Sequence, residues 1–480
     1  MINSCHGNSK RQRFFFLFSL TILCFFSAGY IDTFDATPSI RTAESIWQQQ
    51  RAGLDFQEAN WDFYAMGRGG YLYSKMGVTL PLLYLPSVIV ADQISALLSY
   101  PTVLHILISL THSLMAALLA TCFFVFFRVQ RSNLASAILT LIVFGSSLLL
   151  PYSKTCHREI LQALLLFLPF CLLETSFNRR YLFLSGLSLG LGILTKQAFI
   201  VPAFAVLLWS LKVLYERKRL IDFLCISLPV LFAALAWSFI ADWIWGTPLA
   251  TGYSAKVMNI SGAAWKTPLL EGLWQQWFSS EKGIFVYCPL LLLIPFFWNN
   301  RAIAFPWAIL AFVLQSLLYA RWESPTGHEA YSARYLVVTL PPLLMGLRNY
   351  IPRGQFQQGF CAAILMLSFS LQGIASSVKI QQFYTVQQRA EANLGISHWQ
   401  ANLLFFTHKL AGKPERYSRE KLGLGSSGWV NVSDVRTLRG WNFWWDHLRR
   451  SDPVKEFRPN PSPEAHPIHK VQQWRQSETS

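Results

Sequence analysis

Long apolar runs alternate with short polar segments along most of the chain. The first run, Phe14–Tyr30, is followed directly by a polar loop, and the charged residues are concentrated between the later runs. Many runs approach the roughly 20 residues that a membrane-spanning helix needs. The pattern therefore predicts an all-α polytopic membrane protein. The later runs are 102–127, 134–150, 160–176, 181–195, 199–215, 221–243, 284–298, 303–320, 335–348 and 357–376.

One further run, Leu80–Leu98, contains Pro81, Pro86 and Asp92, and we interpret it as a helix that lies at the outer membrane interface. If this run does not span, the basic turns all fall on the side of the N-terminus, as the positive-inside rule requires. If it did span, the same turns would face outward. We therefore predict eleven spans, with the N-terminus cytoplasmic and the C-terminus outside. The basic turns contain Arg128/Arg131, Arg179/Arg180, Arg217/Lys218/Arg219, Arg301 and Arg348/Arg353.

Composition agrees with a membrane protein. Of the 480 residues, 52% are hydrophobic and only 14% are charged, against about 25% charged in ordinary soluble domains. The net charge of +16 is explained by cytoplasmic basic turns and does not indicate a nucleic-acid partner. The eight Cys form no CxxC pair, so neither a disulfide framework nor a metal site is predicted.

The chain divides into two parts by composition. Residues 1–378 form the predicted membrane domain, in which Phe14–Tyr30 is an uncleaved first span and 31–79 is a large first outer loop with interfacial helices. Residues 379–480 form a predicted small extracytoplasmic C-terminal region. Its prolines indicate a loose segment after about residue 455.

The first outer loop contains two candidate functional residues. Asp35 precedes a predicted short helix, Pro38–Trp47, so it is either an N-terminal cap or a general base that takes a proton from a hydroxyl. Lys75 follows Tyr73 and Ser74 at headgroup depth. It is either a lysine that extends toward the interface or a cation for a lipid-linked phosphate.

Later outer segments contain the other candidates. Glu159 begins a span, where an ionisable group is costly and is therefore more often functional. Arg334 leads into a span on the outer side, against the positive-inside tendency, and arginine is well suited to binding phosphate. A sugar or phosphate pocket could be lined by Tyr253, Lys282 and Tyr287. Weaker candidates are His328 and Glu329.

The order of these segments resembles bacterial members of the C-type glycosyltransferase superfamily. It is most similar to the dolichyl-phosphate-mannose–protein mannosyltransferase-like proteins, which are integral-membrane enzymes. The similarity extends over residues 30–345. The motifs are the Asp35 loop with RTAESI, YLYSKMGVTLPLLYLP, LPYSKTCHREILQALLL, GLSLGLGILTKQAFIVPAF, WGTPLATGY, KGIFVYCPLLLL and SARYLVVTLPPLL.

The resemblance implies an inverting hexosyltransferase in a bacterial inner membrane. It would move a sugar from a polyprenyl-phosphate donor to a hydroxyl of a lipid, glycan or protein acceptor at the outer face. Asp35 would be the base, Lys75 and Arg334 would bind the donor phosphate, and Glu159 would orient sugar or acceptor. Tyr253, Lys282 and His328 would complete the substrate site. No nucleotide cofactor is expected, and a divalent metal is left open.

Three other functions remain open from the sequence. A transporter or flippase for a lipid-linked or anionic substrate would use outer cations and a midplane cavity. A polymerase or ligase of surface polysaccharide would also act on polyprenyl-linked sugars outside. A structural scaffold with an external tail is the third.

Overall fold

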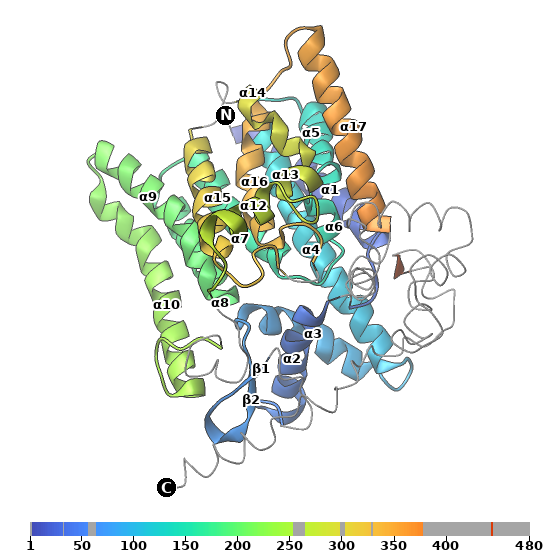
Figure 1. Ribbon diagram of the computed structural model, residues 1–480, viewed down its shortest axis with the longest axis vertical. Coiled ribbons are helices and arrows are strands. Elements are labelled where there is room, and N and C mark those ends of the chain that lie inside the picture. Colours follow the sequence, from blue (N-terminus) through green and yellow to red (C-terminus); the bar gives the residue numbers. More distant parts are fainter. Residues whose placement is uncertain are drawn as a thin grey trace.

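The computed structural model describes residues 2–31, 33–55, 64–252, 265–297, 303–327, 330–377 and 443–444. Helices account for most of them (Figure 1). The α-helices are α1 (Ile2–Phe25), α2 (Thr37–Gln49), α3 (Thr79–Gln93), α4 (Tyr100–Arg128), α5 (Asn133–Gly145), α6 (Leu149–Tyr152), α7 (Glu159–Thr175), α8 (Arg179–Thr195), α9 (Ile200–Glu216), α10 (Phe223–Trp245), α12 (Leu269–Trp277), α13 (Ile284–Tyr287), α14 (Ile294–Phe297), α15 (Phe305–Ala320), α16 (Leu340–Leu344) and α17 (Gln355–Ser377). Short 3₁₀ helices are η1 (Phe34–Ala36), η4 (Arg68–Gly70), η5 (Gln197–Phe199), η6 (Leu220–Asp222), η7 (Pro289–Leu293), η9 (Arg334–Thr339) and η10 (Met345–Arg348).

The predicted all-α membrane class is confirmed, and most predicted runs coincide with helices. Among the described residues, four helical segments are long and apolar enough to cross a membrane: Tyr100–Arg128, Gln197–Glu216, Leu220–Trp245 and Gln355–Ser377. Asn133–Gly145 and Phe305–Ala320 are shorter apolar helices. The count of eleven spans stays a prediction.

Four predicted runs differ from the helices that form. The run 134–150 is divided into α5, which ends at Gly145, and α6, which begins at Leu149. The run 284–298 is divided into α13, η7 and α14, and the run 335–348 into η9, α16 and η10. The divisions of 284–298 and 335–348 lie at or beside prolines, Pro289 in the former and Pro341–Pro342 in the latter, which lack an N–H and disfavour a helical residue before them. The first helix ends at Phe25 instead of Tyr30, so residues 27–30 lie in a turn.

The basic turns that the sequence assigns to the cytoplasm contact one another at one end of the bundle. Arg131 donates hydrogen bonds to the carbonyls of Arg348 and Tyr350 at 2.8 and 3.2 Å. Arg348 forms a buried ion pair with Glu174 of α7 at 3.1 Å, and Glu174 also accepts from the backbone of 303 and 304. The turns at 179–180 and 217–219 are joined because Asp222 binds Arg179 at 2.7 Å and Arg219 at 2.5 Å. These turns therefore lie on one side of the bundle. The interpretation of Leu80–Leu98 as a non-spanning helix stays a prediction.

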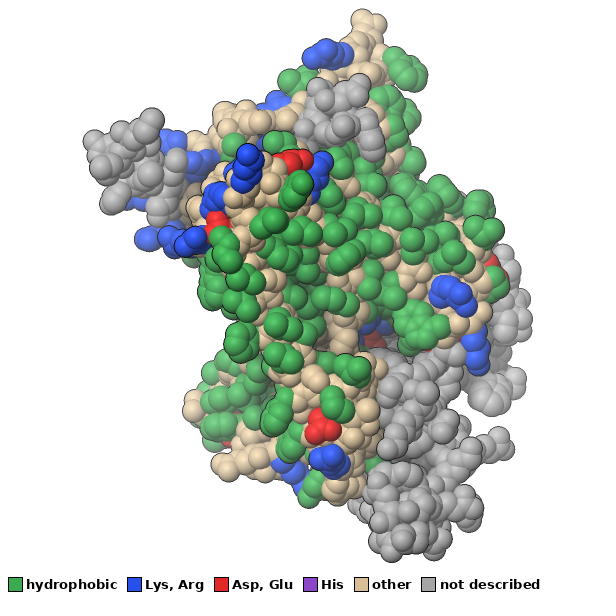
Figure 2. Space-filling view, turned by 90° about the vertical axis from the view of Figure 1, so that its left-hand side faces the viewer, with side chains coloured by type: hydrophobic (Ala, Val, Ile, Leu, Met, Phe, Trp, Pro, Cys, Tyr) green, Lys and Arg blue, Asp and Glu red, His purple; other side chains and the backbone are tan. Residues whose placement is uncertain are grey.

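Hydrophobic side chains cover the middle of the face formed by α9 and α10 (Figure 2), and Lys and Arg gather above them. On α10, the exposed fraction is 70% for Phe232, 56% for Leu235 and 75% for Phe239. Exposed apolar area of this extent marks an interaction surface, and its position between polar ends fits contact with lipid tails.

The first outer loop forms a small layer at the opposite end of the bundle, where α2, α3, β1 (Tyr64–Met66) and β2 (Leu72–Ser74) lie together (Figure 1). The two strands pair antiparallel with Ala65 opposite Tyr73. The loop is fixed to the end of α8, because Val78 N–H donates to the Leu194 carbonyl at 2.9 Å and Thr79 donates to Leu191 at 3.2 Å. This attachment holds the loop over the ends of the helices.

Candidate functional site

The centre of the candidate site is an ion pair between Asp35 and Arg334, two residues that are far apart in the sequence. Asp35 lies in η1, and Arg334 is the first residue of η9. Asp35 does not cap α2, because the N-cap is Ala36 and no side chain caps this helix. The capping interpretation of Asp35 is therefore wrong, and its carboxylate is directed to the arginine instead.

A second carboxylate lies on the other side of Arg334. Glu159 is the first residue of α7, and its Oε1 lies 3.9 Å from Arg334 Nε. Glu159 is almost fully buried, and its Oε2 accepts no hydrogen bond from the described residues. A buried acceptor without a donor is costly, so this oxygen is available to a substrate hydroxyl.

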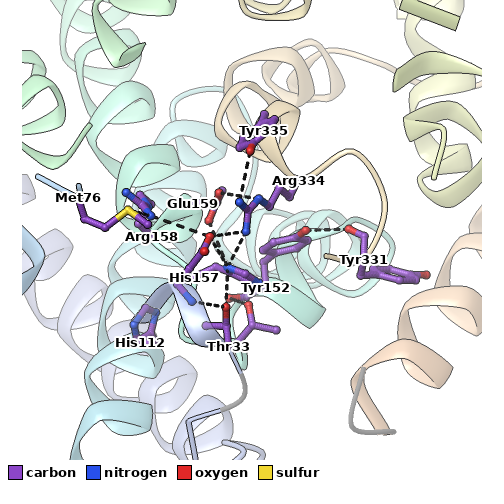
Figure 3. A network of polar contacts seen from close by, with 12 residues as sticks. Thr33, Met76, His112, Tyr152, His157, Arg158, Glu159, Tyr331, Arg334 and Tyr335 are labelled. Atoms are coloured by element: carbon purple, nitrogen blue, oxygen red, sulfur yellow. Dashed lines mark hydrogen bonds and ion pairs between the residues drawn. The ribbon is translucent and has the colours of Figure 1, made fainter. Parts of the chain in front are cut away.

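His157 lies near both carboxylates, and Figure 3 shows it beside Glu159 and Arg334. Its Nδ1 is 3.9 Å from Asp35 Oδ2 and 4.0 Å from Glu159 Oε2. The Thr33 hydroxyl lies 3.4 Å from the same nitrogen. His157 therefore connects the turn before α7 with the segment that carries Asp35.

Two further cations face Asp35. Arg158 Nη2 lies 3.9 Å from Asp35 Oδ2 and also contacts the Met76 sulfur, next to Lys75. Lys196, in the turn between α8 and η5, lies against two stacked tyrosine rings. Its Nζ is 4.7 Å from the ring centre of Tyr319 and 4.4 Å from that of Tyr335, which is within the range of a cation–π contact.

The position of Arg334 is fixed from two directions. Its Nη2 donates to the Tyr335 hydroxyl at 3.3 Å, and its backbone N–H donates to the Thr326 carbonyl at 3.1 Å. Gly327 adopts φ +94°, and a Cβ there would lie 2.5 Å from Arg334 Cγ and Nε. Glycine is required both by this conformation and by the close approach of the arginine side chain.

The charges of the site set the protonation of Asp35 and Lys196. Burial opposes ionisation of Asp35, but Arg334, Arg158, His157 and Lys196 together hold the pKa of this carboxyl well below its usual range. Burial, Arg158 and Arg334 lower the pKa of Lys196 to about 7, and Glu159 and Asp35 oppose this shift. Asp35 is therefore an anion, and Lys196 changes charge near neutral pH.

The structure describes five of the seven predicted site residues and brings three of them together: Asp35, Glu159 and Arg334. Lys75 is buried on the same side, and a Cβ at Gly252 would lie 2.6 Å from its side chain. Lys282 is also buried, and its carbonyl accepts from Ser332 at 3.2 Å. Neither lysine forms an ion pair with Asp35 or Glu159 within the described part of the chain. Tyr253, His328 and Glu329 lie outside the described residues.

Sequence reasoning missed Lys196. The signal was present, because Lys196 lies in a turn that the predicted topology places outside, where a basic residue departs from the positive-inside tendency. The same argument had selected Arg334. His157 and Arg158 directly precede Glu159 in the sequence, but only Glu159 was predicted as a site residue.

Together these residues form a site with two carboxylates and several cations at one end of the bundle. The cations can bind an anion such as phosphate, and the carboxylates can accept a proton or hydroxyl hydrogen bonds. The described residues contain no group of three His, Cys, Asp or Glu side chains arranged to hold a metal ion.

Searches by sequence found no match among protein families or curated proteins. The structure is similar to two crystal structures of ArnT from Cupriavidus metallidurans. One is bound to undecaprenyl phosphate, with 12% identity, a TM-score of 0.48, and coverage of 83% of this chain and 75% of the other. The second is in the apo state, with 12% identity, a TM-score of 0.46, and coverage of 83% and 74%.

Proposed function

We propose that this protein is an inverting glycosyltransferase that moves a hexose from a polyprenyl-phosphate donor to an acceptor hydroxyl at the outer membrane face. The observation that carries the proposal is the ion pair of Asp35 with Arg334, beside the buried Glu159. It supplies a proton acceptor and a phosphate-binding cation in direct contact. The predicted orientation, with a cytoplasmic N-terminus, places this end outside.

The ion pair explains how the donor activates the base. In the resting protein Arg334 holds Asp35 as a weakly basic anion. A donor phosphate that binds Arg334 competes with the carboxylate, and release from the arginine makes Asp35 more basic. Asp35 therefore becomes an effective base only when the donor is in place.

The transfer itself is a single displacement. The acceptor oxygen forms a bond to the anomeric carbon, and the bond from that carbon to the phosphate oxygen breaks with its electron pair on the phosphate. The acceptor proton moves to the Asp35 carboxylate, and the anomeric configuration is inverted. Arg334, Lys75 and Lys196 stabilise the charge that develops on the leaving phosphate. The unpartnered oxygen of Glu159 orients a sugar or acceptor hydroxyl, and Tyr253, Lys282 and His328 remain proposed substrate contacts.

The location of charge favours this function over a transporter. Among the described residues, no buried Asp, Glu, Lys or Arg lies in the middle of a predicted span. Transport through a midplane site relies on such groups. A site at one end of the bundle instead suits a donor whose lipid stays in the bilayer while its sugar is transferred outside.

Donor binding is expected to depend on pH through Lys196. Below pH of about 7 its ammonium is present before the donor binds, and above this value binding must take up a proton. The donor KM should therefore be constant at low pH and rise above neutrality, by up to about tenfold per pH unit. The measurement is donor KM between pH 6 and 9.

Lys196→Arg provides the control, because its guanidinium stays charged over this range. Its donor KM should show no rise above pH 7. A rise of the same size in Lys196→Arg would assign the effect to another group.

Lys75→Ala is expected to raise the donor KM by about tenfold, the cost of one charge-assisted hydrogen bond, with a smaller change in kcat. Lys75 is buried and directly follows β2, and its neighbour Met76 contacts Arg158. The measurement is the rate against donor concentration in membranes with equal amounts of protein. Unchanged dependence on donor concentration would remove Lys75 from the donor site.

The direct test of the proposed function is the lipid content of cells that lack the protein. A polyprenyl-phosphate sugar should accumulate, and it should disappear when the wild-type gene is restored. Purified protein should then release polyprenyl phosphate from that lipid only when an acceptor is present. No accumulating lipid-linked sugar, and no release from any polyprenyl-phosphate hexose, would contradict the proposal.

A further inference from the structure

Phe443 and Trp444 belong to the C-terminal region, and both contact the membrane domain. They lie far beyond the end of α17 at Ser377 in the sequence. Their contacts are with the turn that follows α1 and with the turn that precedes α7. These turns lead to Asp35 and to His157, respectively.

Trp444 is fixed against the turn after α1. Its backbone N–H donates to the Ser27 carbonyl at 2.9 Å. Gly29 adopts φ +73°, and a Cβ at this position would overlap the Cβ of Trp444. On the other side, Ser109 of α4 lies 2.5 Å from the Ser27 hydroxyl and 3.0 Å from the Gly29 nitrogen. The turn is therefore held between α4 and Trp444.

Phe443 lies against a cation of the second turn. Lys154 Nζ is 4.0 Å from the centre of its ring and donates to the Ser376 carbonyl at 2.7 Å. The ring also contacts Phe26 edge-on, with the centroids 5.7 Å apart. Phe443 therefore joins the end of α1, the turn before α7 and the end of α17.

The two turns lead directly to the site. The Cys156 thiol lies 3.8 Å from the Tyr30 carbonyl, and Thr33 contacts His157 at 3.4 Å. Two residues separate Lys154 from His157, and one separates Thr33 from Asp35. A shift of either turn would change the distance between the base and its neighbouring groups.

We propose that Phe443 and Trp444 are positioning residues, which dock on the turns at 27–29 and 153–156 and thereby set the geometry of Asp35 and His157. This inference rests on the proposed function only for its effect on transfer. The docking itself is a property of the chain that exchange measurements detect without any substrate. Two aromatic residues of the predicted C-terminal region thus contribute to the function of the membrane domain.

The test uses full-length protein in detergent, with Trp444→Ala, Phe443→Leu and Phe443→Tyr. Trp444→Ala should speed amide hydrogen exchange at 27–33 and 153–158 by tenfold or more, and leave exchange in α9 and α10 unchanged. It should lower kcat by about tenfold, since small misplacements of catalytic groups have effects of this order or larger. The donor KM should stay within twofold, because neither residue contacts the donor cations.

The phenylalanine variants separate positioning from packing. Phe443→Tyr keeps the ring face for Lys154 and should retain wild-type kcat, whereas Phe443→Leu keeps apolar volume and should lose activity. Phe239→Ala on α10, which removes an exposed aromatic ring elsewhere, should change neither exchange nor kcat. Unchanged exchange in Trp444→Ala, or equal loss in Phe443→Tyr and Phe443→Leu, would overturn the proposal. If wild-type protein transfers no sugar, the exchange result still decides whether the docking is real.

Discussion

Asp35→Asn is expected to lower kcat by about 10³-fold, within the range that general-base catalysis contributes. An amide keeps the shape of the carboxylate and can still accept a hydrogen bond from Arg334, but it cannot take the acceptor proton. The donor KM should fall or stay constant, because Arg334 no longer has to leave an anion to bind phosphate. The measurement is transfer from a polyprenyl-phosphate hexose in membranes with matched protein levels.

Asp55→Asn is the matched control for this prediction. Asp55 lies in the same outer loop, pairs with Arg51 at 2.5 Å and is 52% exposed. Its loss removes an equal charge without touching the site, so activity should remain normal. Full activity in Asp35→Asn would show that another group is the base.

Arg334→Ala is the second large effect that we expect. It removes the cation nearest to both carboxylates, and loss of one such charge-stabilising group typically costs about 10²–10³-fold in kcat. It also leaves Asp35 and Glu159 close together without their shared partner, so the variant should be less stable to heat. Both kcat and the midpoint of thermal aggregation in detergent should therefore be measured.

Arg334→Lys separates these two effects. Lysine restores the positive charge but not the planar fork that reaches Asp35, Glu159 and the Tyr335 hydroxyl at once. We expect stability to recover in large part and kcat to remain at least about tenfold low. Arg321→Ala removes an exposed arginine from the segment before η9 and should leave activity unchanged. If Arg334→Ala retains wild-type kcat, the phosphate contact must lie elsewhere.

Asp35, Glu159 and Arg334 could be assigned to one side of the membrane from the sequence. The positions of the basic turns and the number of spans between them determine the side of every loop. Basic turns indicate which ends of the apolar runs share a side, and the three ionisable residues are then predicted to share the other side. Their contact is seen only in the structure. The contacts among Arg131, Arg348 and Glu174 confirm the shared side of the basic turns. The prediction worked at this level without any knowledge of how helices pack.

The remaining features depend on packing and were not predictable in the same way. Lys196 packs against the stacked rings of Tyr319 in α15 and Tyr335 in η9. How these two helices are rotated relative to each other cannot be read from the spacing of apolar residues. Trp444 docks on the turn at 27–29, which is more than 400 residues away in the sequence. The glycine that this contact requires, Gly29, cannot be told from the other glycines by sequence alone. The roles of Lys75 and Lys282 stay predictions, because burial alone does not define a ligand.

The joined basic turns restrict how the helices can rearrange. Glu174 is bound to Arg348 and to the backbone before α15, and Arg348 is linked through its carbonyl to Arg131. Breaking a buried pair of this kind costs about 3–5 kcal/mol. We therefore expect the helices to pivot about the ends that carry the basic turns, so that the opposite half of the bundle widens to admit and release the isoprenoid chain of the proposed donor.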